Sequence, residues 1–357
     1  MKRFLIFIAL LAAVACENEI PYDFGEAGPK LMVTGFLYAG AVEQTVNVSL
    51  SEGGTVSGVG DATVRCSVNG TLAASASAHS DDKARGAQYH QLPVSFKADF
   101  TVGDVVVLEV EAAGHKAFTP ELTVPAAPIV EKADTTHTTV THADWSEEVV
   151  RFTVDMTDRK GEDNWYALNL VKEVTGTFSF EDGRPDIPVV RRSYPMISHS
   201  SLTDPILLDG NMALTDVDLD IMDYMDYLGD GRFETFSDQL FRDGPARLVF
   251  DSSRQYYYPG ADSDYLFDLL IRSYGVGSDG FVPWPTSDEI SLSVEVQVHG
   301  CSKDAYLYLR ALRTVRSNGY NPVLTEPVTI PGNIIGGIGF VDVLNTAAVR
   351  IDLPSAE

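Results

Sequence analysis

The feature that most constrains this fold is a series of short segments in which apolar and polar residues alternate, separated by turns rich in glycine, proline and asparagine. Alternation with a period of two is typical of β-strands that bury one face. In the first third of the chain we expect strands at residues 31–38, 44–50, 62–68, 89–100, 105–111 and 118–124. Asn69-Gly70 predicts a hairpin turn, and the small, polar residues 75–86 predict a loop. The even spacing predicts an immunoglobulin-like β-sandwich over residues 30–126.

The second part of the chain continues the β pattern after Pro120, Pro125 and Pro128. These prolines mark a domain boundary, because proline cannot donate a hydrogen bond to a continuing sheet. We expect further strands at residues 149–156, 165–174, 188–194, 247–251, 265–273, 290–299 and 349–353. Residues 127–357 are therefore predicted to form a larger β-rich domain with an acidic insertion at residues 199–244. The predicted fold class is mainly β.

One helix is expected in the C-terminal region. Ser302 or Asp304 can cap its start, and Ala305, Leu309 and Leu312 share one face at helical spacing. Such a face packs against a core.

The first residues predict an export signal that ends in a lipid anchor. Lys2 and Arg3 precede an uncharged apolar run at residues 4–14, which is too short to span a bilayer as a helix. Small residues and then Cys16 follow, as in bacterial lipoprotein signals. We expect residues 1–15 to be a lipoprotein signal peptide, Cys16 to be acylated and residues 16–29 to be a tether. Ordinary signal peptidase could also cleave here, and would leave a soluble protein.

The negative charge of the chain restricts its partners. The chain carries 51 acidic and 26 basic residues, a formal charge of −25, and loss of Lys2 and Arg3 with the signal makes it −27. Nucleic acid and anionic lipid surfaces would repel such a chain, so we expect no nucleic-acid partner. Solubility outside the cytoplasm is one interpretation of the charge, and binding of divalent cations is the other.

The densest acidic segment runs from Asp216 to Asp230. Carboxylates at alternate positions can supply the hard oxygen ligands that calcium needs. A calcium-binding helix–loop–helix starting at Asp216 would, however, need glycine and glutamate where Ile221 and Tyr227 stand. We favour a helix that turns its aspartates to solvent, with a loose calcium site as the alternative.

Other site chemistry has little support in the sequence. His137 and His142 would face opposite sides of a strand, and there is no zinc-type pair of cysteines. The sequence has no G-x-S-x-G motif, and a carboxylate pair for glycoside hydrolysis needs a separation that sequence does not reveal. We therefore expect no catalytic residue, no metal and no cofactor.

Three further features leave alternatives open. The glycine-rich residues 332–339 predict a sheet-edge turn at which the tail crosses close to other backbone, in preference to a phosphate loop. The aromatic residues at 256–259 and 281–285 could contact sugars or proteins, or could fill the ends of a core. Cys66 and Cys301 could form a disulfide, or could be two buried thiols, which we favour.

Several segments occur in the order known from one family. They are Phe236–Phe241, Tyr306–Leu312, Glu326-Pro327, Asn333–Phe340 and, near the N-terminus, residues 30–35, 48–51 and 61–64. In these segments the chain resembles the Bacteroidetes lipoproteins catalogued as domain of unknown function 4249, whose genes often lie beside a TonB-dependent outer-membrane receptor. The resemblance covers nearly the whole mature chain, and it assigns no catalytic residue.

The resemblance implies a lipoprotein of the outer membrane, exposed at the cell surface. It would be held by lipid on Cys16 and act as a non-enzymatic binding or accessory subunit of a TonB-dependent nutrient-uptake system. Glu17 and Glu19 are similar to the surface-export signal of such lipoproteins. The sequence departs from the family at Ala13, where leucine is commoner, and at Val341-Asp342, where we expect more glycine. The alternatives are a stand-alone surface adhesin or structural lipoprotein, and an extracellular hydrolase.

Overall fold

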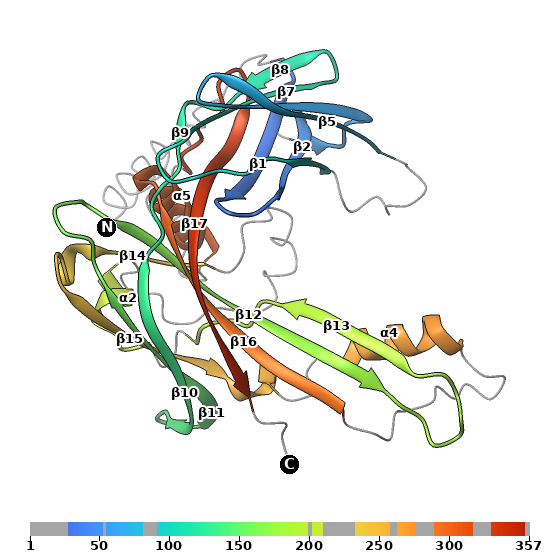
Figure 1. Ribbon diagram of the computed structural model, residues 1–357, viewed down its shortest axis with the longest axis vertical. Coiled ribbons are helices and arrows are strands. Elements are labelled where there is room, and N and C mark those ends of the chain that lie inside the picture. The colour runs from blue at the N-terminus through green and yellow to red at the C-terminus, as the bar shows by residue number, and fades with distance from the viewer. Residues whose placement is uncertain are drawn as a thin grey trace, which may run out of the picture.

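The computed structural model describes residues 28–52, 55–80, 91–198, 202–209, 233–257, 263–275, 289–316 and 330–353. It confirms the prediction of a mainly β protein. The strands form two lobes, one above the other along the long axis of the molecule (Figure 1). Of the described residues, those between 30 and 124 and those at 338–344 form the N-terminal lobe, and those between 129 and 316 and those at 345–353 form the C-terminal lobe.

The N-terminal lobe is a sandwich of two sheets around one core. The first sheet contains β1 (Lys30–Tyr38), β2 (Glu43–Glu52), β3 (Thr55–Ser57) and β6 (Leu92–Lys97). The second contains β4 (Asp61–Val68), β5 (Thr71–His79), β7 (Val105–Ala112), β8 (His115–Phe118) and β9 (Leu122–Thr123). Buried and less buried residues alternate along β7, as expected for strands with one face in the core.

In this lobe one predicted hairpin turn is confirmed, and one predicted loop is wrong at its start. Asn69 and Gly70 both have positive φ, 51° and 76°, and join β4 to β5, which confirms the predicted hairpin. The loop predicted from residue 75 is wrong at its start, because β5 continues to His79. Ala74, Ala76 and Ala78 alternate with serines and pack against the core, so small residues still supply a strand with one apolar face.

The C-terminal lobe packs two antiparallel sheets face to face. One sheet has the order β10 (Ile129–Thr141), β11 (Ser146–Thr157) and β15 (Pro245–Ser253). The other contains β13 (Ile187–Ser193), β12 (Trp165–Phe178), β16 (Glu289–Cys301), β17 (Ile338–Leu353) and, paired with β12, β14 (Glu234–Ser237). Phe152 and Phe250 stack in the core between them with ring centroids 5.3 Å apart.

Three α-helices lie among the described residues: α2 (Pro205–Asp209), α4 (Ser263–Tyr274) and α5 (Lys303–Arg316). Helix α5 confirms the predicted C-terminal helix, with the Ser302 hydroxyl accepting a hydrogen bond from the Ala305 N–H at 3.0 Å and with Leu309 and Leu312 buried. The strand predicted at residues 265–273 is wrong, because this segment forms α4. Its leucines recur at helical spacing, and Leu270 is fully buried.

Strand β17 belongs to both lobes. Its first half, up to Leu344, pairs in parallel with β1, and its second half, from Asn345, pairs antiparallel with β16. One nine-stranded sheet therefore runs through the whole molecule, and Val341 and Val343 enter the core of the N-terminal lobe. The predicted last strand, residues 349–353, is the end of this much longer element. The predicted domain boundary near residue 126 stays a prediction, and β17 connects the two sides of it.

The start of β17 comes unusually close to β1. Gly339 has φ +106°, and a Cβ there would collide with the carbonyl oxygen of Val33. A Cβ on Gly337 would lie 2.6 Å from the carbonyl oxygen of Leu31. The predicted close crossing of the glycine-rich tail is confirmed, and it lies where the start of β17 runs beside β1. Strand β16 pairs with β17 only from Asn345 onward.

Replacement of Gly339 should therefore destabilise the whole protein. Gly339→Ala adds a methyl group against the Val33 carbonyl and forces a strained φ, so we expect the free energy of unfolding to fall by roughly 3 kcal/mol. Equilibrium unfolding in urea measures this. Gly60→Ala is the matched control, because nothing lies within 4 Å of a Cβ at Gly60; equal effects of the two substitutions would contradict the proposed crossing.

Candidate functional site

The two lobes meet where β1, β16, β17 and α5 come together, and this junction buries several polar side chains. Asp342 of β17 is 2 % exposed. Its carboxylate accepts hydrogen bonds from the Ser302 hydroxyl and, at 2.8 Å, from the Val343 N–H. Burial raises the pKa of Asp342 to about 6. Because Ser302 also caps α5, Asp342 ties the shared strand to the start of that helix.

His299 of β16 occupies the middle of the same junction and is fully buried. Its Nε2 lies 3.0 Å from Oδ1 of Asn169 on β12, and its Nδ1 lies 2.8 Å from the hydroxyl of Thr346 on β17. The amide oxygen can only accept, so Nε2 carries the proton. Burial lowers the pKa of His299 to about 3, which keeps the ring neutral at physiological pH. His299 thus cross-links three adjacent strands and has no access to solvent.

An aromatic cluster and a buried ion pair complete the junction. Phe340 of β17 stacks on Tyr308 of α5 at 4.2 Å, and Phe36 of β1 packs edge-on against Phe233. At the other end of α5, Arg313 pairs with Glu234 of β14, and burial lowers the pKa of its guanidinium to about 9. Each of these elements carries a segment on which the family resemblance depends. Part of the resemblance therefore lies at the junction of the lobes, whereas residues 48–51 and 61–64 lie in β2 and β4 of the N-terminal lobe.

Residues 124–128, between β9 and β10, link the two lobes, and contacts with the C-terminal lobe hold this linker in place. The Pro125 carbonyl accepts a hydrogen bond from Asn345 Nδ2 at 2.8 Å, and the Ala127 carbonyl accepts one from Arg159. Between them, the Ala126 carbonyl lies directly over Gly300, where a Cβ would collide with it. The proline-rich linker is therefore held in place.

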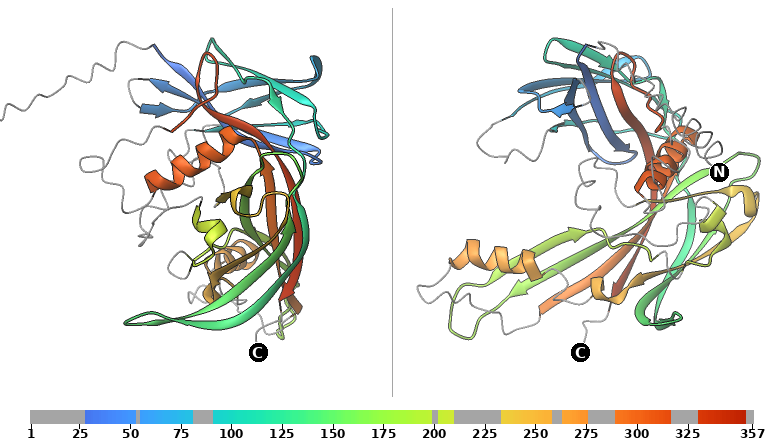
Figure 2. Two further views of the ribbon diagram at one scale, coloured as in Figure 1. Left: turned by 90° about the vertical axis from the view of Figure 1, so that its left-hand side faces the viewer. Right: turned by 180° about the vertical axis from the view of Figure 1, so that it is seen from behind.

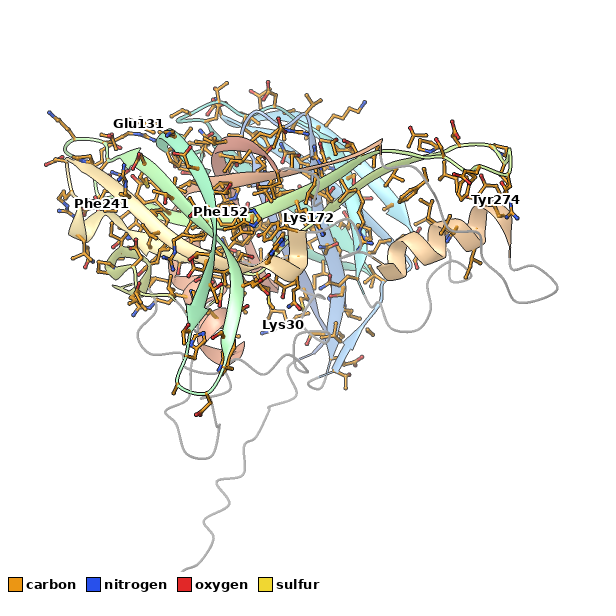
Figure 3. All side chains as sticks on the ribbon, turned by 90° about the horizontal axis from the view of Figure 1, so that it is seen from below. Lys30, Glu131, Phe152, Lys172, Phe241 and Tyr274 are labelled. Carbon is orange, nitrogen blue, oxygen red and sulfur yellow. The ribbon has the colours of Figure 1, made fainter. Side chains whose placement is uncertain are left out.

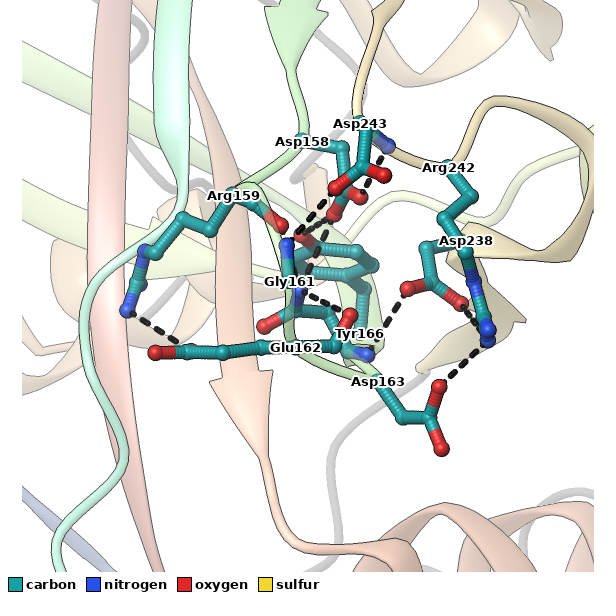
Figure 4. A network of polar contacts seen from close by, with 10 residues as sticks. Asp158, Arg159, Gly161, Glu162, Asp163, Tyr166, Asp238, Arg242 and Asp243 are labelled. Carbon is teal, nitrogen blue, oxygen red and sulfur yellow. Dashed lines mark hydrogen bonds and ion pairs between the residues drawn. The ribbon is translucent and has the colours of Figure 1, made fainter.

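A network of polar contacts closes the adjoining loops of the C-terminal lobe (Figure 4). Asp158 accepts hydrogen bonds from Asn164 Nδ2 (3.1 Å), the Tyr166 hydroxyl (2.9 Å) and the Asp243 N–H (2.9 Å). Asp238 accepts one from the Asn164 N–H at 3.0 Å. Both carboxylates are 2 % exposed, and burial beside Asp158 raises the pKa of Tyr166 far above its ordinary value. These carboxylates are occupied by donors and join the β11–β12 and β14–β15 connections.

A lysine is buried on the core-facing side of β12. Lys172 is 3 % exposed, and its Nζ donates to the Tyr256 carbonyl at 2.8 Å. Figure 3 shows Lys172 and Phe152 toward the middle of the C-terminal lobe, and Tyr274 at the outer end of α4. The lysine holds the turn after β15 against the opposite sheet.

The candidate residues from sequence fall into two groups. Cys16, the segment from Asp216 to Asp230 and residues 281–285 lie outside the described residues. Among the described residues, Tyr257 is buried, and its hydroxyl donates a hydrogen bond to the Ser252 hydroxyl at 2.8 Å. This aromatic residue therefore fills the core. Cys66 and Cys301 are free and buried in different clusters; the disulfide alternative is wrong, and the buried-thiol interpretation is confirmed. Burial raises the pKa of Cys66 to about 11.

The histidines and the other acidic residues form no metal site in the part of the chain that the structure describes. No group of three or more His, Cys, Asp or Glu side chains there could hold an ion. His137 is exposed on β10, whereas His142 stacks on Trp145 with ring centroids 3.9 Å apart.

The exposed Trp145 is a feature that the sequence analysis missed. It lies in the turn between β10 and β11 and is 51 % exposed. Strand β10 was not among the expected strands because its polar threonines hide the alternation. The β-branched threonines and Val140 within residues 135–141 are the signal that could have revealed it.

These features define a two-lobed β protein with a buried, hydrogen-bonded junction. Among the described residues no helix is both long enough and apolar enough to cross a bilayer. The sequence matches the family model described as "Domain of unknown function (DUF4249)" over residues 17–350, and the chain belongs to this family. In the comparison with curated proteins, no match was found.

The buried carboxyl at the junction should give the protein a measurable dependence of stability on pH. The pKa of Asp342 is about 6 in the folded state and about 4 in an unfolded chain, so the folded state binds the proton more tightly. The free energy of unfolding therefore contains a contribution that is present below pH 4 and is lost as the pH rises to about 6, roughly 2–3 kcal/mol in all.

Asp342→Asn should remove this contribution, while the amide oxygen keeps an acceptor for the Val343 N–H and the amide NH2 can donate to the Ser302 hydroxyl in place of accepting from it. We expect the variant to be at least as stable as the native protein at pH 7, and the difference between the two to shrink toward pH 4. Urea unfolding at several pH values measures it. Asp352→Asn, at a carboxylate that is 87 % exposed, is the control. A difference that does not change with pH would show that Asp342 is ionised freely in the fold.

Proposed function

We propose that this protein is a surface-exposed lipoprotein of the outer membrane, anchored by acylated Cys16. In this proposal it is a non-enzymatic binding or accessory subunit of a TonB-dependent nutrient-uptake system. The observation that carries the proposal is the cysteine at position 16, directly after an uncharged apolar run with a basic start. Family membership over residues 17–350 is consistent with it.

The position of the first strand supports an anchor at this end. β1 begins at the exposed Lys30, at the upper end of the N-terminal lobe (Figure 1). Residues 16–29 can span at most about 45 Å when fully extended. In this arrangement the N-terminal lobe, for which we retain the immunoglobulin-like description as part of the proposal, lies nearer the membrane, and the C-terminal lobe extends away from it.

The rigid junction supports a role in presenting a surface. Asp342, His299 and the fixed linker hold the two lobes in one arrangement. A rigid support lowers the entropy that must be lost when a partner binds. The polar side-chain atoms of Asp342 and His299 form hydrogen bonds within the chain. This supports a scaffold for binding better than a site for a reaction.

The anchor is tested by substitution of the cysteine. Cys16→Ala should move the protein from the detergent phase to the aqueous phase in a Triton X-114 partition, because the acyl chains supply the membrane affinity. Cys66→Ala is the control, since Cys66 is buried in the fold and should not affect anchoring. Retention of Cys16→Ala in the detergent phase would contradict the lipid anchor.

The accessory role is tested by affinity capture of the tagged, lipidated protein from its native membrane, followed by mass spectrometry. We expect one TonB-dependent receptor at a stoichiometric level. Recovery of no stoichiometric membrane protein would favour the stand-alone adhesin.

A further inference from the structure

The β10–β11 hairpin projects from the C-terminal lobe (left view of Figure 2). Its strands pair from Ile129↔Thr157 to Thr141↔Ser146, whereas β15 supports β11 only as far as Val149. Residues 139–148 therefore form a two-stranded tip, and we call this segment the hairpin tip. It lies at the opposite end of the long axis from the start of β1 (Figures 1 and 2).

Trp145 is held in place although it is exposed. Its ring stacks on His142 at 3.9 Å with an angle of 19° between the planes, and the His142 N–H donates to the Trp145 carbonyl at 2.8 Å. The residue is nevertheless 51 % exposed to solvent. A fixed tryptophan loses little side-chain entropy on binding, which is why such residues are strong anchors at protein interfaces.

Acidic residues lie next to this anchor in the sequence. Asp144 precedes Trp145, and Glu147 and Glu148 follow it. Arg254, at the end of β15, pairs with Glu148 at 2.7 Å, and the hairpin tip itself contains no lysine or arginine. The surface that best complements the tip is an apolar pocket bordered by basic residues. A second copy fits poorly because each chain carries a formal charge of −25.

We propose that the hairpin tip is a docking element for a partner protein that offers an apolar pocket for Trp145 ringed by lysine or arginine. The proposal rests on the proposed function in one respect: an accessory subunit needs a partner surface, and this tip is the end that the anchor leaves free. Lipid anchoring and docking are measured separately, so one can fail without the other.

The test places a photoreactive amino acid, p-benzoylphenylalanine, at position 145 of the full-length protein in its native cells. The control places it at Val102, which is 59 % exposed but lies in the N-terminal lobe. Irradiation should give one discrete protein adduct from position 145 and none of that size from position 102. Sequencing of the cross-linked peptide should place it beside lysine or arginine. Fractionation of the same cells reports separately whether the protein is anchored.

Charge and shape are then varied one at a time. Asp144→Asn, Glu147→Gln and Glu148→Gln in combination should lower the adduct yield severalfold, as should high salt. With the identified partner purified, Trp145→Ala should raise Kd by roughly tenfold or more, Trp145→Phe should restore part of the affinity, and Val102→Ala should leave Kd unchanged. The proposal is overturned by no adduct, by an adduct to lipid, glycan or a second copy alone, or by a yield that the neutral variants do not change.

Discussion

The structure depends on the passage of β17 between β1 and β16. There β1 and β17, the first and last strands of the described residues, pair in parallel, and β17 continues into the C-terminal lobe. Close approach of the backbones requires glycine at positions 337 and 339, since any side chain would meet a carbonyl oxygen of β1. Because the paired strands are some 300 residues apart in sequence, this contact carries a large loop-closure entropy. The contacts of His299, Asp342 and Asn345 at the junction all include this strand.

Buried polar groups surround that strand and give the junction a defined geometry. His299 connects β12, β16 and β17, and Asp342 connects β17 to the cap of α5. A buried polar group without partners would be costly, whereas one with satisfied hydrogen bonds disfavours alternative packings. The raised pKa of Asp342 shows that some stability at neutral pH is lost at this position.

Much of the local structure could be predicted from sequence. The alternation in β7 and β11, the Asn69-Gly70 turn and the Ser302 cap of α5 are local signals, and the structure bears them out. Errors arose where a local signal was ambiguous. Residues 265–273 contain an apolar run that suits a strand or a helix, and β5 alternates alanine with serine, which resembles a polar loop. Among the candidate site residues, the sequence allowed Tyr257 and the two thiols to be predicted as core residues. The exposure of Trp145 could not be predicted in this way, because it results from the hairpin in which Trp145 lies.

The sequence by itself determined the mainly β class, the family and the presence of an apolar N-terminal run ending at Cys16. Each depends on neighbouring residues, which a linear pattern records. Only the tertiary structure decided that β17 joins both lobes, that His299 and Asp342 are buried, and that Trp145 is exposed on a projecting tip. These properties depend on which distant residues pack together, and a polar residue in a strand gives no local sign of whether its neighbours in space will be water or protein.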